Sequence, residues 1–192
     1  MLTEIFKTAC DKYILNLGNF LVVTLLLYIF YIILLKLSLV GGELVRPFFL
    51  AGMLYIVFFF KEKAEINFFF YAFKNKNLAI KILLYTIIRW FLITLGTLFF
   101  IIPGIYIAIA TIFVLPYIVM EPEIEVFDAF KKSFKMFNSN FLLVMAIVGI
   151  LIFINIITAF PYGLFSIFTV PFSICIIGVT FEKLYYGVEY VK

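Results

Sequence analysis

The chain has 192 residues, and it contains no histidine. Without histidine it cannot form the Ser–His or Cys–His dyads that activate a nucleophile. No pair of carboxylates falls within one of its long apolar runs, so the groups needed for acid–base hydrolysis inside a membrane are missing. The GxxxxGK[ST] loop that binds nucleotide phosphates is also absent. These absences predict a protein that is not an enzyme and that uses no cofactor.

Cysteine is scarce as well. Cys10 and Cys175 are the two cysteines, and neither has a neighbouring cysteine or a metal-ligand spacing. We therefore expect no disulfide and no zinc site, and we interpret both residues as small buried or interfacial side chains.

Apolar residues are abundant and charges are few. Hydrophobic residues make up 66% of the chain, aromatic residues 21% and charged residues 14%, whereas a soluble domain has about 45–50% apolar and about 25% charged residues. A soluble core could not cover so much apolar surface, so lipid is the predicted solvent. The net charge of +4 does not gather on a soluble face, and no nucleic-acid partner is expected.

Six apolar runs approach or exceed the roughly 20 helical residues that cross a hydrocarbon core about 30 Å thick. They cover residues 13–37, 44–60, 78–102, 104–120, 141–160 and 162–181. None shows the alternating polarity of a β-barrel strand. Because the connections between paired runs are short, we expect an all-α polytopic membrane protein. It would be one integral membrane domain with six transmembrane helices arranged as three hairpins.

The basic residues indicate the orientation of these helices, because cytoplasmic loops carry an excess of Lys and Arg. Twelve of the 15 basic residues lie at the termini or in two of the connections, at Lys7, Lys12, Lys61, Lys63, Lys74, Lys76, Lys81, Lys131, Lys132, Lys135, Lys183 and Lys192. Lys36 and Arg46 lie on the opposite side. Both termini are therefore predicted to be cytoplasmic.

An asparagine and a proline recur with each pair of runs and suggest an internal repeat. The residues are Asn19, Asn77 and Asn140, followed 28, 26 and 31 residues later by Pro47, Pro103 and Pro171. Asparagine is a favoured N-cap, and proline fits the first turn of a helix. We predict that the asparagines cap three helices, that the prolines open the returning ones, and that the chain turns at Pro103 and Gly104. The alternative is chance similarity between segments rich in Phe, Ile and Leu.

An amphipathic segment precedes each asparagine, and these segments cover residues 2–12, 65–77 and 124–138. In the third segment one predicted face carries Phe127, Phe130, Phe134 and Phe137, while Lys131, Lys132 and Lys135 lie away from it. This pattern is typical of a helix in the cytoplasmic membrane interface, where each lysine contributes about 1 kcal/mol near an anionic surface. Anionic membrane lipids are therefore expected partners. The alternative is a cytoplasmic helix packed on the bundle.

Arg89 lies about two helical turns inside the third predicted span, roughly 12 Å beyond Lys81. A charge in the middle of a bilayer costs about 2.5–3.5 kcal/mol on insertion scales, so such a residue suggests a functional site. The predicted turn at Pro103 and Gly104 places Arg89 near Glu121, which favours an intramembrane ion pair. The alternatives are snorkelling to the interface and contact with a lipid phosphate or an anionic substrate.

Several other polar residues fall in or near the runs. Glu43 and Arg46 are three residues apart and predict a surface pair. Pro116 predicts a kink in the fourth span. The mild polar residues of the last two runs are predicted to bridge helices; they are Asn155, Thr158, Ser166 and Ser173.

The order of turn, kink and capping residues from about Trp90 onward carries a family resemblance. These residues are Pro103, Gly104, Ile105, Pro116, Glu121, Ala129, Ser133, Asn140, Pro171 and Tyr185. In this half of the chain the sequence resembles the YciC-like family of bacterial integral membrane proteins. That family is related to the membrane domain found beside some glycerophosphodiester phosphodiesterases. The resemblance implies a multi-pass protein of the cell inner membrane with six helices, and it supplies no catalytic residues.

Our leading hypothesis is a non-catalytic membrane protein that interacts with lipids or with partner membrane proteins and supports envelope organisation. A transporter or permease subunit is the alternative, because many transporters are built from repeats. A third possibility is a membrane subunit for a soluble cytoplasmic enzyme. A solvated cavity that reaches the middle of the membrane and is lined by Arg89, Asn155 or Ser173 would favour transport, whereas a closed apolar bundle with a lipid-filled groove would favour the first hypothesis.

Overall fold

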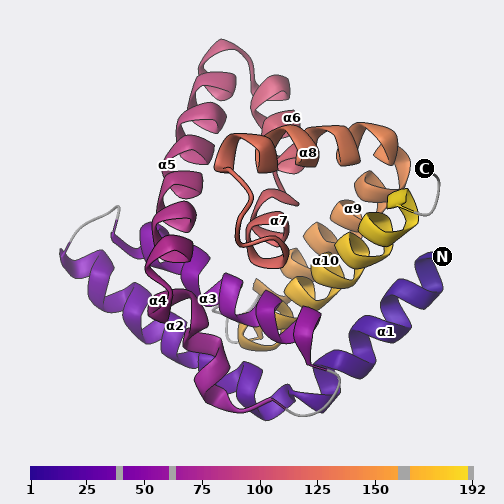
Figure 1. Cartoon of the computed structure of the whole chain (residues 1–192). Helices are drawn as coiled ribbons and strands as arrows, with labels where there is room; N and C mark the ends of the chain where they lie inside the picture. Colours follow the sequence, from indigo (N-terminus) through magenta and orange to yellow (C-terminus); the bar gives the residue numbers. More distant parts are fainter. Residues whose placement is uncertain (38–40, 61–63, 160–164, 190–192) are drawn as a thin grey trace.

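The computed structural model describes residues 1–37, 41–60, 64–159 and 165–189, and within these residues the chain is all-helical (Figure 1). The all-α class predicted from composition is thus confirmed for this part of the chain. The elements are α1 (Leu2–Leu15), α2 (Leu17–Leu37), α3 (Gly41–Phe59), the 3₁₀ helix η1 (Ile66–Phe70), α4 (Tyr71–Lys74), α5 (Lys76–Phe99), α6 (Ile101–Ala110), α7 (Val114–Met120), α8 (Val126–Ser139), α9 (Phe141–Ala159) and α10 (Ser166–Glu189).

Four helical stretches of the described residues are long and apolar enough to cross a membrane. They are Lys76–Phe99, Ile101–Met120, Phe141–Thr158 and Ser166–Gly187. A fifth candidate is α1 together with the first part of α2, a pair bent by 81°. The chain is therefore consistent with a multi-pass membrane protein. Six spans arranged as three hairpins remain a prediction, since α3, which corresponds to residues 44–60, is not among these candidates.

The first predicted span, residues 13–37, is broken at Asn16, where α1 ends and α2 begins. The side chain of Asn16 is buried, and its Oδ1 accepts a hydrogen bond from the backbone N–H of Ala64 (2.9 Å). One turn later, Nδ2 of Asn19 donates to the carbonyl of Ala64 (2.5 Å). Asn19 thus lies inside α2, which begins at Leu17, and is not its cap. Its side-chain amide instead holds the backbone at residue 64.

The other two predicted caps also differ. The N-cap of α5 is Asn75, whose Oδ1 accepts from the N–H of Leu78 (3.2 Å), so Asn77 lies within the helix. Asn75 takes this role because its backbone is extended, as an N-cap requires. Asn140 directly precedes α9 as predicted, but its amide donates to the carbonyl of Met136 in α8 (3.1 Å).

The prolines follow the prediction in part. Pro103 lies in the first turn of α6, where its missing N–H costs little. Pro47 and Pro171 instead lie inside α3 and α10. Pro116 is the third residue of α7, and the helical run is interrupted just before it at residues 111–113. Its missing N–H cannot bond the carbonyl four residues earlier, which accounts for an interruption at this place.

The turn between α5 and α6 lies at Phe100 rather than at Pro103 and Gly104. Phe100 has extended backbone angles (φ −160°, ψ 147°), and α6 resumes at the next residue. Gly104 has a different role, because a Cβ atom there would lie 2.3 Å from Oγ1 of Thr97 and 2.9 Å from its backbone N. The absence of a side chain therefore lets α6 approach the last turn of α5 closely.

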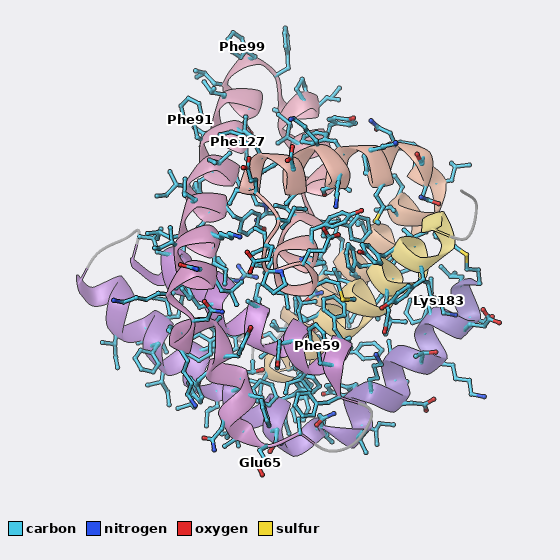
Figure 2. All side chains as sticks on the ribbon, in the orientation of Figure 1. Phe59, Glu65, Phe91, Phe99, Phe127 and Lys183 are labelled. Carbon is cyan, nitrogen blue, oxygen red and sulfur yellow. The ribbon has the colours of Figure 1, made fainter. Side chains whose placement is uncertain are left out.

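The tip of this helix pair is fully apolar and projects from the molecule, as the position of Phe99 in Figure 2 shows. Leu98, Phe99, Phe100, Ile101 and Ile102 are 69–79% exposed. An exposed patch of this kind in water would be an aggregation site, so its exposure agrees with a lipid environment.

Buried residues of α3, α7 and α10 form part of the core. The fully buried ring of Phe181 contacts Phe58, Phe113 and Tyr117, with ring centroids 4.7–6.1 Å apart. In addition, α1 packs along α10 (Figure 1). Lys12 joins the two helices through an ion pair with Glu182 (3.0 Å), and it also donates to the carbonyl of Val57 in α3.

The three predicted amphipathic segments take different forms. Residues 2–12 lie within α1, and residues 124–138 correspond to α8. Residues 65–77 do not form one helix, because they divide into η1, α4 and the start of α5. In this segment Phe69 is fully buried, while Phe73 is 44% exposed.

Candidate binding cavity

A cavity of about 400 Å³ lies among α3, α5, α7, α9 and α10. Its walls are mostly apolar, and they include Leu50, Leu54 and Ile174. Polar and charged side chains also line it, namely Glu43, Arg46, Tyr85, Thr86, Arg89, Asn155 and Ser173. A concave, largely apolar site with a few convergent polar groups is the usual form of a ligand site.

Arg89 enters the cavity from the middle of α5 and is half-buried. Its Nε donates to Oγ1 of Thr111 (3.2 Å), and its Nη2 reaches the carbonyl of Ala108 (3.5 Å). Thr111 is fully buried and stands just after the end of α6, so the interruption between α6 and α7 supplies the acceptor. These two bonds use two of the five donors of a guanidinium group and leave the others for a ligand.

Arg46 reaches the same cavity from α3. Among the described residues it forms no ion pair, although Glu43 lies one turn earlier on the same helix. Glu43 instead accepts a hydrogen bond from the hydroxyl of Tyr31 (3.3 Å), so the predicted Glu43–Arg46 pair is not formed. Arg46 and Arg89 therefore line one cavity from two different helices, and Tyr85 lies on the same wall.

A ladder of hydrogen bonds joins α9 to α10, and two of its members, Asn155 and Ser173, line the cavity. Nδ2 of Asn155 donates to Oγ of Ser173 (3.1 Å), and the hydroxyls of Thr158 and Thr169 lie 3.1 Å apart. Thr169 also reaches Oδ1 of Asn155 (3.4 Å). Because these groups satisfy one another across two helices, the prediction that they bridge helices is confirmed.

The predicted ion pair between Arg89 and Glu121 is wrong. Oε2 of Glu121 lies 2.8 Å from Nζ of Lys132 in α8, while Arg89 bonds Thr111. The cause is the position of the turn. A turn at Phe100 pairs Arg89 with the residue eleven positions beyond the turn, Thr111, whereas a turn at residues 103–104 would have paired it with residues close to Glu121.

The phenylalanines of α8 do not share one environment. Phe130 and Phe137 are buried against other helices, whereas Phe127 is 64% exposed, so the predicted lipid contact stays a prediction. The buried face includes the small residues Ala129 and Ser133, and Oγ of Ser133 donates to the carbonyl of Ala110 in α6 (2.7 Å). Small residues let α8 approach α6 closely, so the face turns toward them and leaves Phe127 at its edge.

Phe134 and the three lysines of α8 lie outside the buried face. Phe134 is half-buried against the ring of Tyr106, with centroids 6.2 Å apart. Lys131, Lys132 and Lys135 are exposed. Lys131 pairs with Asp128 on its own helix (3.1 Å), while Lys132 pairs with Glu121. Packing on other helices is the arrangement given above as the alternative to an interfacial helix.

Sequence reasoning singled out Arg89, Asn155 and Ser173, and the structure places all three on the cavity wall. It missed Tyr85 and Thr86 as wall residues, and also Thr111, which holds Arg89. The signal available for Thr111 was a single threonine in the middle of an apolar run. No protein-family model, no curated protein and no solved structure matches the chain.

Proposed function

We propose that this chain is a non-catalytic membrane protein that holds the anionic head of a lipid, or of another membrane-soluble ligand, in the cavity between α3, α5, α7, α9 and α10. One observation carries the proposal: Arg46 and Arg89 line the same mostly apolar cavity. Arg89 lies within a candidate span, and charged residues inside a membrane are costly and mark ligand or ion sites by default. An anionic group would offset that cost for Arg89 and would also attract Arg46.

The surroundings of the cavity support a ligand with an apolar part. Trp90 lines the cavity and is 53% exposed, so the wall continues to the outer surface of α5. The next residue, Phe91, is 62% exposed on the same helix. A lipid could place its head at the arginines and its chains along this apolar surface.

The wider setting belongs to the same proposal. It comprises six spans, cytoplasmic termini in a cell inner membrane, and a role in envelope organisation together with lipids or a protein partner. The exposed lysines of α8 fit contact with anionic headgroups. The resemblance to the YciC-like family agrees with this setting.

The test is native mass spectrometry of the full chain extracted with its lipids. We expect a phospholipid that stays bound to the wild type and is lost about tenfold more readily from Arg46→Gln and Arg89→Gln, since a hydrogen bond to a charged group contributes about 1.5–3 kcal/mol. Lys7→Gln is the matched control, because it removes one positive charge from an exposed site on α1 outside the cavity. Equal retention by all four proteins, or a wild type without bound lipid, would refute lipid binding here.

Transport is the second candidate, and the polar wall of the cavity favours it. Arg89, Asn155 and Ser173 together offer charge and hydrogen bonds to a small solute, as a substrate pathway requires. Proteoliposomes distinguish the two functions. Flux of an anionic solute that Arg89→Gln abolishes would support transport, whereas retained lipid without flux supports binding alone.

A further inference from the structure

The cavity carries charges of both signs, and they do not neutralise one another. Glu43 and Arg46 line it from α3, and Arg89 lines it from α5. Within the described residues no ion pair joins either arginine to Glu43. The charges on this wall sum to two positive and one negative.

Glu43 is available to a ligand. Its described contact is one hydrogen bond from the hydroxyl of Tyr31 at 3.3 Å, to Oε1. An ionised carboxylate offers about four acceptor positions, so most of its capacity remains. A carboxylate on an apolar wall attracts a group that carries N–H donors and positive charge, because burying an unpaired charge is expensive.

An anionic ligand without a positive group would not suit this wall. Its anionic group would satisfy Arg46 and Arg89, but the nearby carboxylate would repel it and remain unpaired. A ligand that presents an anionic group and an ammonium together satisfies all three side chains.

We infer that the cavity selects a zwitterionic phosphate head of the phosphoethanolamine type. Its phosphate would lie at Arg46 and Arg89, and its ammonium at Glu43. This inference rests on the proposed function and narrows it from anionic heads in general to heads that also carry an amine. The apolar walls formed by Leu50, Leu54 and Ile174 would hold the start of the acyl chains.

The test measures the preference of the full chain, in mixed detergent micelles, for phosphatidylethanolamine over phosphatidylglycerol by native mass spectrometry. We expect the wild type to prefer phosphatidylethanolamine about tenfold, which corresponds to one charge-assisted contact. Glu43→Gln should bring the preference close to parity by weakening phosphatidylethanolamine, while Arg46→Gln and Arg89→Gln should weaken both lipids. Glu123→Gln is the control, since it removes an exposed negative charge outside the cavity and should leave the preference unchanged.

Glu43→Gln should preserve the fold, because the glutamine side chain can still accept the hydrogen bond from the hydroxyl of Tyr31. Binding of both lipids without preference, or an unchanged preference in Glu43→Gln, would overturn the inference while leaving the proposed function standing. Binding of neither lipid to the wild type would defeat both. The last experiment adds soluble phosphoethanolamine to the protein with bound phosphatidylethanolamine. Displacement of the lipid would confirm recognition of the zwitterionic head and would show that the free compound is also a ligand.

Discussion

At the scale of single residues, glycine and asparagine decide where the helices meet. Gly52 packs directly on the backbone of η1, because a Cβ atom there would lie 1.9 Å from the carbonyl oxygen of Phe69. Gly104 does the same for α5 and α6. Asn16 and Asn19 hold the backbone at Ala64. These contacts fix helix positions that a run of Phe, Ile and Leu would leave undetermined.

The alanine variant of Gly104 tests this role. Because the added methyl would meet the backbone of Thr97 at 2.9 Å, we expect Gly104→Ala to lower the stability by about 1–3 kcal/mol, as overpacking does. Thermal unfolding in detergent gives the measurement. Gly149→Ala in α9 is the control, since nothing lies within 4 Å of a Cβ atom there, and it should be neutral or slightly stabilising. Equal stability of the two variants would contradict the close approach.

At the scale of elements, α8 shows that the spacing of large apolar residues alone does not determine which face of a helix packs on its neighbours. Four phenylalanines at helical spacing predicted one face, but hydrogen bonding by Ser133 and the small size of Ala129 rotate the packed side. Phe137 and Phe127, which the pattern treats alike, therefore have opposite environments. Phe137 is 1% exposed and Phe127 is 64% exposed.

Alanine substitutions separate these two positions. Phe137→Ala should destabilise the protein by about 3–5 kcal/mol through the cavity that it leaves. Phe127→Ala should change the stability by less than about 0.5 kcal/mol, as at other surface positions. Chemical denaturation in mixed micelles would measure both. Similar losses at the two positions would restore the face expected from the phenylalanine spacing.

The helical class and the prediction that Arg89 belongs to a functional site could both be made from the sequence, because composition and a charge within an apolar run can be read without knowing the fold. It could not supply the partner of Arg89. That partner depends on the turn at Phe100, and the turn depends on the contact between Gly104 and Thr97, which joins two helices. The choice of Asn75 over Asn77 as a cap is likewise a matter of backbone conformation and not of residue type.

At the scale of the whole molecule, two ion pairs attach α1 to α10. Lys12 and Glu182 lie 3.0 Å apart with side chains 21% and 26% exposed, while Lys183 and Glu4 lie 3.1 Å apart with 31% and 69% exposed. The first pair is shielded by neighbouring helices and should be coupled more strongly, since solvent weakens exposed pairs.

Double-mutant cycles compare the two pairs. We expect a coupling of about 1–2 kcal/mol between Lys12 and Glu182, because breaking a sheltered pair leaves a partly buried charge. The coupling between Lys183 and Glu4 should be about 0.2–1 kcal/mol. Raising the salt concentration should reduce the second value more than the first. A larger coupling for the exposed pair would contradict this ranking by solvent exposure.

The bond between Arg89 and Thr111 also bears on how the protein is made. Arg89 leaves the ribosome 22 residues before the hydroxyl that receives it. Until then α5 alone would carry its charge into the bilayer, at a cost of about 2.5–3.5 kcal/mol on insertion scales. We therefore expect α5 to wait beside the translocation channel and to enter the lipid together with α6, so that biosynthesis handles the two helices as one unit.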